Sequence, residues 1–109
     1  MITLDDFKKI ELRVARIVDV REVPGADRIW QLVIDLGGEP AQTREIVAGV
    51  KKFYSRESLI GKLIVVIQNL EPAVIRGIAS HGMLLAAKSG DGLALLSPDQ
   101  SIAPGAIIG

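Results

Sequence analysis

Hydrophobic and polar residues alternate along most of this chain, and this pattern predicts short β-strands rather than helices. From Glu11 to Val23 apolar positions alternate with charged ones, but the phase of the alternation shifts near Ala15–Val18. Strict alternation is typical of a half-buried strand, and a change of phase within it indicates a bulge or a sharp coil. The sequence therefore predicts a long, strongly bent first strand, as a small closed barrel requires.

The same kind of pattern predicts five further strands. Their ranges are Ile29–Leu36, Thr43–Val50, Lys62–Gln68, Gly82–Lys88 and Leu93–Leu96. Lys62–Gln68 is nearly all apolar, which predicts burial on both faces. The last two strands are predicted to form a hairpin around Ser89-Gly90-Asp91-Gly92, a strong turn sequence.

Two short helices interrupt this series of strands. The acidic start after Thr3 predicts a capped helix over about Leu4–Lys9, with Phe7 and Ile10 on its inner face. Ser55–Gly61 predicts one or two helical turns between the third and fourth strands. Three strands, a small helix and then more strands is the order of the OB fold.

Turn sequences separate the predicted elements, and we find no internal repeat. They are Pro24-Gly25-Ala26-Asp27, Gly37-Gly38-Glu39-Pro40 and Asn69-Leu70-Glu71-Pro72. We predict that residues 1–109 form one all-β domain, an OB-fold five-stranded Greek-key barrel with short helices and a C-terminal extension.

The composition excludes several kinds of catalytic and metal site. Cysteine is absent, and His81 is the single histidine, which leaves too few groups for a thiolate zinc site or a catalytic triad. Ser80 and His81 are adjacent on an extended segment, so their side chains should point to opposite faces. Asp19, Glu22 and Asp35 lie among arginines and predict surface ion pairs. We therefore expect no catalytic residue, no metal and no cofactor.

The distribution of apolar residues also bears on location. The longest apolar run, Leu63–Ile67, has five residues, whereas a membrane span needs about 20. Asp5 and Asp6 near the start argue against a secretory signal. We expect a cytoplasmic protein with no membrane partner.

Charge limits the kind of nucleic-acid binding that is possible. Thirteen basic and thirteen acidic side chains balance to zero, whereas nucleic-acid binders usually carry a positive excess. An RNA site would have to come from local clustering of basic residues such as Arg28 and Lys51. The four aromatic residues are few for a surface that stacks single-stranded bases, but recognition of a folded RNA backbone needs fewer.

Residues Val66–Ala87 carry the most specific motif, V-I-Q-N-L-E-P-A-V-I-R-G-I-A-S-H-G-M-L-L-A-A. This segment resembles the signature of the tRNA-binding domain family. Members occur at the C-terminus of methionyl-tRNA synthetases, as a separate synthetase β subunit and as free structure-specific tRNA-binding proteins. Further matches follow in chain order at Phe7, Leu12-Arg13-Val14, Ala26-Asp27-Arg28, Ile46–Val50, Pro98-Asp99 and Pro104-Gly105.

The resemblance implies an OB barrel that binds folded tRNA by shape, without catalysis. It implies RNA-binding roles for five residues of the motif, namely Asn69, Arg76, Ser80, Gly82 and Met83. Asn69 and Ser80 could bond sugar and phosphate oxygens, Gly82 would allow close approach of the RNA, and Met83 would offer an apolar contact. Two structural alternatives stay open: Met83 in the barrel core and Asn69 as a turn residue.

Some residues depart from the family pattern. Glu71 and Ala73 stand where basic residues are common, and His81 stands where glutamine is common. The loss of positive charge motivates an alternative, a chaperone-like or protein-interaction homodimer similar to the CsaA branch of the family.

The apolar C-terminal segment predicts a homodimer, because its residues have little reason to be exposed in a monomer. They are Ile102, Ala106, Ile107 and Ile108. The family resemblance implies that such dimers pair through the N-terminal helix and the C-terminal segment.

Overall fold

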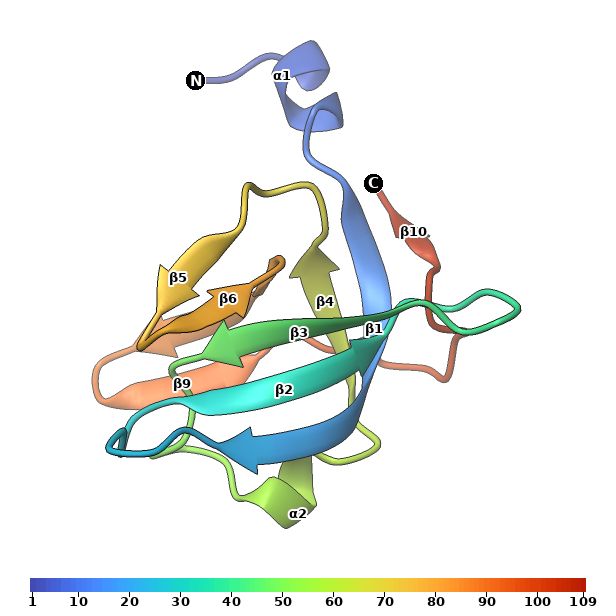
Figure 1. Ribbon diagram of the computed structural model, residues 1–109. Helices are drawn as coiled ribbons and strands as arrows, with labels where there is room; N and C mark the ends of the chain where they lie inside the picture. The colour runs from blue at the N-terminus through green and yellow to red at the C-terminus, as the bar shows by residue number, and fades with distance from the viewer.

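The chain folds into short β-strands and two short α-helices. The computed structural model describes residues 1–109 (Figure 1). Its elements, in chain order, are α1 (Leu4–Lys8), β1 (Leu12–Glu22), β2 (Trp30–Asp35), β3 (Thr43–Ala48), α2 (Arg56–Leu59), β4 (Leu63–Ile67), β5 (Ala73–Ile75), β6 (Ile78–Ser80), β7 (Met83–Leu84), β8 (Ala86–Ser89), β9 (Gly92–Leu95) and β10 (Ile107–Ile108). No helix is both long enough and apolar enough to cross a membrane.

The predicted bend in β1 is confirmed. Its first half pairs with β4, from Leu12 to Arg16, and its second half pairs with β2, from Arg16 to Glu22. The register between β1 and β2 shifts between Ile17 and Asp19, which leaves one extra residue on β1. Such a bulge bends the strand and increases its twist. One strand thereby belongs to both halves of the barrel.

The predicted OB barrel is also confirmed. The strands follow the order β3-β2-β1-β4-β7, and all these pairs are antiparallel. The barrel closes between β3 and the segment that joins β6 to β7. There the backbone N–H of His81 donates to the carbonyl oxygen of Glu45 at 2.9 Å. Closure is completed by the side chain of Ser80, which accepts a bond from the Val47 N–H on β3.

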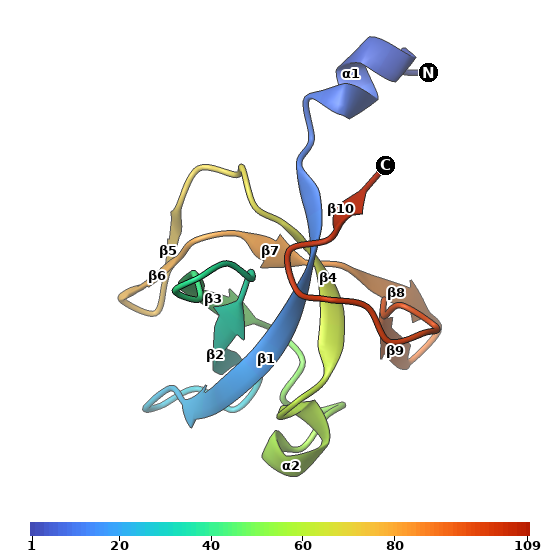
Figure 2. The ribbon, with the colours of Figure 1, turned by 90° about the vertical axis from the view of Figure 1, so that its right-hand side faces the viewer.

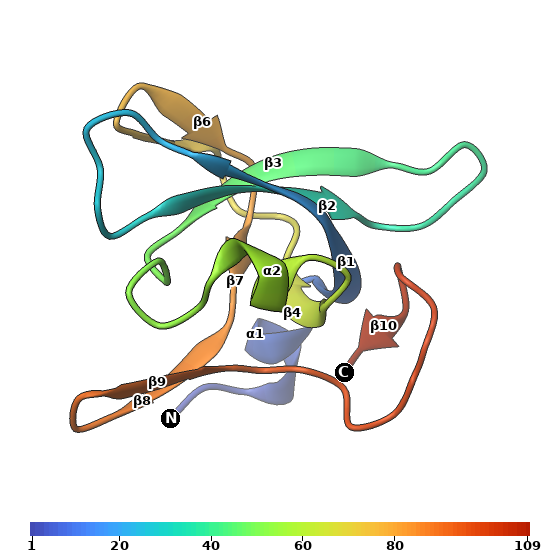
Figure 3. The same ribbon diagram turned by 90° about the horizontal axis from the view of Figure 1, so that it is seen from below.

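The core side chains come from alternating positions along the strands, as the sequence pattern predicted for β2. Its largest fully buried side chains are Ile17, Leu32, Ile34, Ile46, Leu59, Ile64 and Val66. Leu59 comes from α2, which lies across the lower end of the barrel (Figure 3). In β4 only Ile64 and Val66 are buried. The prediction that this strand is buried on both faces is wrong, because the residues that alternate with these two are only half-buried.

Helix α1 forms where it was predicted but does not pack on the barrel. Thr3 and Asp6 form a capping box, in which the Thr3 hydroxyl accepts from the Asp6 N–H and the Asp6 carboxylate accepts from the Thr3 N–H. That backbone bond helps to hold the pKa of Asp6 below its usual value. No residue of α1 is buried, and the helix stands beyond one end of the barrel (Figure 2). The predicted inner face of Phe7 and Ile10 is therefore wrong, because both are exposed.

The second half of the chain is more divided than predicted. The segment after Pro72 contains a short hairpin, β5–β6, that the sequence pattern missed. Its turn has positive φ at both central residues, 52° at Arg76 and 78° at Gly77, as a tight hairpin turn requires. The predicted strand Gly82–Lys88 is split into β7, which pairs with β4, and β8, which pairs with β9.

The C-terminal segment is bonded to β1 rather than free. The N–H of Gly105 donates to the carbonyl of Val14 at 2.7 Å, and the N–H of Val14 donates to the carbonyl of Ala106 at 2.9 Å. The last strand, β10, then pairs with Leu12 and Arg13 of β1. The tail is thus part of the sheet.

Candidate nucleic-acid interface

The outer face of β2 and β3 carries an open polar hollow of about 780 Å³. Its lining comes from β1, β2 and β3, from the segment after β4 and from the segment between β6 and β7, and consists of Arg21, Val33, Thr43, Arg44, Glu45, Gln68, Leu70 and His81. In OB folds, this face and the loops beside it bind oligonucleotides and oligosaccharides. Here those loops are the β1–β2 turn and the segment that contains the β5–β6 hairpin, which lie on the same side of the barrel (Figures 1 and 2).

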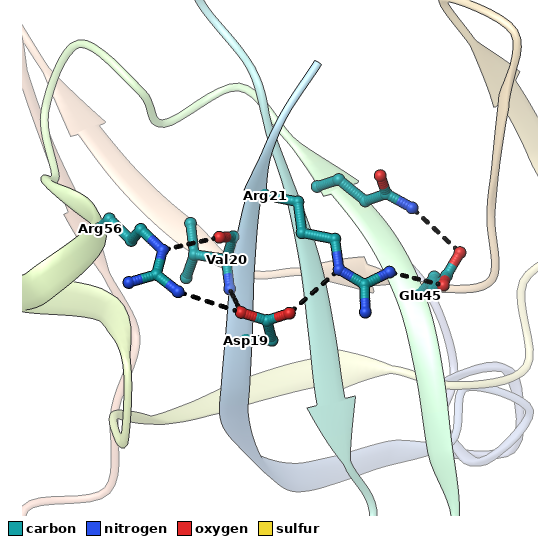
Figure 4. A network of polar contacts seen from close by, with 6 residues as sticks. Asp19, Val20, Arg21, Glu45 and Arg56 are labelled. Carbon is teal, nitrogen blue, oxygen red and sulfur yellow. Dashed lines mark hydrogen bonds and ion pairs between the residues drawn. The ribbon is translucent and has the colours of Figure 1, made fainter.

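A chain of charged side chains borders this hollow (Figure 4). The guanidinium of Arg21 donates from Nε to Asp19 Oδ2 at 3.0 Å and from Nη1 to Glu45 Oε1 at 3.3 Å. Arg56 reaches the other oxygen of Asp19 at 3.3 Å and the carbonyl of Val20 at 3.0 Å. The predicted surface pairing of Asp19 is confirmed.

Asp19 is fixed in its ionised form by this network. The hydrogen bond from Arg21, the backbone N–H of Val20 and the nearby charge of Arg56 hold the pKa of Asp19 below its usual value. A carboxylate with a lowered pKa stays charged throughout the neutral range. Asp19 therefore orients both arginines at any physiological pH.

An apolar groove of about 460 Å³ lies beside the hollow. It runs from the end of β3 to β7 and β8, and Leu70 lines both cavities. Met83 lines the groove and is 47% exposed, so the alternative that placed it in the barrel core is wrong. Lys88 and Glu71 are the charged residues of the groove.

Ser80 is engaged inside the protein. It is only 3% exposed, and its hydroxyl accepts from the Val47 N–H at 2.9 Å and donates to the Gly82 carbonyl at 3.1 Å. The hydroxyl thereby joins β3 to the end of β6 where the barrel closes. His81 lines the hollow outside, so the two neighbours lie on opposite sides, as expected.

Gly82 makes a close approach within the chain. Its φ is +125°, and a Cβ atom there would lie 2.9 Å from the carbonyl oxygen of Ile67 on β4. The absence of a side chain therefore lets β7 pair with β4. Gly82 therefore has an internal role in the barrel, and its contact with RNA stays a prediction.

Asn69 links α1 to the barrel. Its side-chain oxygen accepts from the Glu11 N–H at 2.9 Å, and its amide nitrogen donates to the Lys9 carbonyl at 2.7 Å. Both ends of the side chain are thus used by the segment that enters β1. The alternative interpretation of Asn69 as a structural turn residue agrees with these contacts.

The predicted basic residues differ in availability. Lys51 lies 4.7 Å from the centre of the Trp30 ring and 3.7 Å from a carboxylate oxygen of Glu22, so it packs on the β1–β2 turn. Arg28 and Arg76 are exposed, and their side chains make no ion pair or hydrogen bond within the chain. They belong to the two loops that flank the outer face.

The pairing of Arg21 with Glu45 was not predicted. These residues are 24 positions apart and meet because the β1 bulge sets the register between β1 and β2, and β2 pairs in turn with β3. Charge alternation in each strand is visible in the sequence, but the bulge position decides which charges meet.

Comparison with known proteins supports the resemblance to the tRNA-binding domain family. Residues 12–107 match the family described as "Putative tRNA binding domain". The chain is 53% identical over 105 residues to the methionine–tRNA ligase of Thermotoga maritima and 48% identical over 107 residues to that of Thermococcus onnurineus. These matches cover 96% and 98% of this chain but only 16% and 14% of those enzymes.

Solved structures match along the full length. A MetRS-related protein from Pyrococcus horikoshii has a TM-score of 0.90 at 27% identity, over 99% of this chain and 97% of that one. The CsaA chaperone protein from Picrophilus torridus has a TM-score of 0.89 at 34% identity and covers 100% of both chains. By the family match, which spans nearly all of its residues, this chain belongs to the tRNA-binding domain family.

Proposed function

We propose that this chain recognises the folded body of tRNA through its outer β2–β3 face and the two flanking loops, without catalysis. The observation that carries the proposal is the placement of Arg28 and Arg76, two exposed and unpaired arginines, on those loops. Arginines in such positions bind phosphates and steer the approach of RNA. Neither the hollow nor the groove contains a phenylalanine, tyrosine or tryptophan, which favours contacts to the RNA backbone over base stacking.

The chain would act either as a free-standing protein or as an appendage or β subunit of a methionyl-tRNA synthetase. The similarity to methionine–tRNA ligases supports the second form. In that form it would raise the affinity of the synthetase for tRNA, and the catalytic residues would lie elsewhere. We place this activity in the cytoplasm.

The test is fluorescence anisotropy with labelled folded tRNA and a length-matched unstructured RNA, over a range of salt concentrations. We expect tighter binding to the folded RNA and a logarithmic affinity that falls linearly with the logarithm of salt concentration. Equal affinity for the two RNAs would contradict shape recognition. Binding of apolar peptides in place of either RNA would instead favour a chaperone-like protein-interaction module, which the apolar groove and the similarity to CsaA make the second candidate.

Replacing Arg28 and Arg76 together by glutamine is expected to weaken folded-tRNA binding by roughly tenfold and to reduce the salt slope by about 2, since each arginine neutralises one phosphate. The matched control removes two charges at the end of α1, as Lys8→Gln in its last residue with Lys9→Gln in its C-cap. That control should retain at least half of the affinity. A similar loss in both variants would show that only total charge matters.

We also propose a homodimer formed through α1 and the C-terminal segment, which lie at the same end of the barrel (Figures 1 and 2). Leu4 and Phe7 on α1 are exposed, and Ile107 on β10 is 77% exposed. Exposed apolar residues gathered at one end of a protein are typical of an interaction surface, and these three come from elements at one end of the barrel.

The dimer is best tested by substitution, because removing the tail would also remove its hydrogen bonds to β1. Phe7→Glu combined with Ile107→Glu should convert a dimer into a monomer in sedimentation velocity. Val74→Glu, which changes an exposed apolar residue on β5, should leave the dimer intact. A monomeric unaltered protein, or a double variant that stays dimeric, would contradict this interface.

A further inference from the structure

Arg21 presents unused hydrogen-bond donors at the hollow. Its side chain is 51% exposed and is oriented by the bond from Nε to Asp19 at 3.0 Å. Nη1 contacts Glu45 at the longer distance of 3.3 Å, and Nη2 has no partner within the chain. A guanidinium held by its Nε edge keeps its terminal nitrogens free to bind a phosphate.

Glu45 is the partner that can be exchanged. Besides the bond from Arg21, Asp19 accepts two further bonds, one from the N–H of Val20 and one from Arg56, which keep it in place. Glu45 is 47% exposed, and its second oxygen accepts from the side chain of Gln31 at 3.0 Å. An exposed ion pair of this kind contributes little to stability, so breaking it leaves the fold intact.

The rest of the hollow suits an anion. Arg44 supplies a second guanidinium, held by a bond from Nη1 to the carbonyl of Gln68. Thr43 and His81 add polar groups, and Glu45 is the single acidic residue of the lining. The volume of about 780 Å³ lies within the range of about 300–1,000 Å³ that is usual for ligand sites.

We infer that this hollow binds a backbone phosphate of the RNA and that Glu45 is an internal counter-ion, which the phosphate displaces from Arg21. That the phosphate belongs to an RNA rests on the proposed function. Until an RNA phosphate reaches Arg21, the carboxylate of Glu45 occupies that guanidinium and repels other phosphates. Repulsion of this kind raises specificity at a cost in affinity, because only a well-positioned phosphate replaces the carboxylate.

Four variants test the role of Glu45 in folded-tRNA binding: Glu45→Gln, Arg21→Gln, the double variant and Glu57→Gln. Glu45→Gln keeps the size of the side chain and removes its charge, and should tighten binding by about fivefold. Arg21→Gln should weaken binding by about fivefold and reduce the salt slope by about 1. Glu57→Gln removes the same charge from α2, outside the lining of the hollow, and should change affinity by less than about twofold.

The double variant separates a local mechanism from a general effect of charge. If Glu45 acts by occupying Arg21, the gain from Glu45→Gln should fall below about twofold when Arg21 is absent. A fivefold gain that persists in the Arg21→Gln background would overturn the inference. An equal gain in Glu57→Gln would overturn it as well.

A second measurement does not depend on tRNA. The Nε–Hε signals of the arginines are followed by NMR during titration with tripolyphosphate. We expect the Arg21 signal to shift at lower tripolyphosphate concentration in Glu45→Gln than in the unaltered protein. If folded tRNA does not bind but this shift occurs, the proposed function fails and the phosphate site stands. If the Arg21 signal shows no response in either protein, the site itself is refuted.

Discussion

Replacing Gly82 by alanine is expected to lower the free energy of unfolding by about 2–4 kcal/mol. A φ of +125° is strained for any residue with a side chain, which costs about 1–3 kcal/mol. The new Cβ would also lie 2.9 Å from the Ile67 carbonyl oxygen, so β7 would have to move away from β4. Urea denaturation, with stability taken from the midpoint and slope, measures the effect.

Gly90→Ala is the matched control for this substitution. Gly90 also has positive φ, at +57°, but a Cβ there would meet no atom within 4 Å. We expect it to cost only about 1–2 kcal/mol, the usual penalty for a left-handed residue with a side chain. Equal costs at the two glycines would contradict the close approach of β7 to β4.

Replacing Ser80 by alanine is expected to destabilise the fold by about 1–3 kcal/mol without weakening RNA binding by the folded protein. The change leaves the N–H of Val47 without its acceptor in a buried position, and an unsatisfied buried donor costs about this much. Ser97→Ala is the control, because the Ser97 hydroxyl is exposed and makes only a 3.4 Å contact.

Two measurements on Ser80→Ala distinguish a structural role from an RNA contact. Urea denaturation should show the loss of stability, and anisotropy below the unfolding transition should give a folded-tRNA affinity within about twofold of the unaltered protein. Unchanged stability with a tenfold loss of affinity would instead support the role in RNA binding that the family resemblance implies.

Much of the barrel could be predicted from sequence because each strand has one face in the core. The alternation in β2 marks Leu32 and Ile34, and the phase change in β1 marks the bulge. The β5–β6 hairpin was missed because its strands have three residues each and all three residues of β5 are exposed, so β5 has no buried face that would produce a pattern. Its turn also contains an arginine with positive φ, which is uncommon for a residue with a side chain and so gives no sequence signal for the turn.

The position of α1 could not be predicted for a different reason. Phe7 in the helix and Ile10 just after it are apolar, but a sequence does not show which molecule covers them. In this structure the barrel does not cover these apolar residues.

The candidate site was predicted only in part. The family motif located the segment that closes the barrel, but the side chains of Asn69 and Ser80 and the glycine at 82 are used for internal contacts. The interactions around Arg21 depend on strand register, which cannot be read from spacing in the sequence. A motif shared by a family therefore contains residues that build the binding surface as well as residues that could contact the ligand.

The central claim, that folded tRNA binds the outer β2–β3 face and its flanking loops, is tested most directly by NMR chemical-shift mapping. Folded tRNA is titrated into the isotopically labelled chain, and the backbone amide signals are compared before and after. We predict the largest shifts at Arg28, Arg76 and the residues lining the hollow, with little change in α2. Shifts confined to α1 and β10, or no shifts at all, would contradict the account.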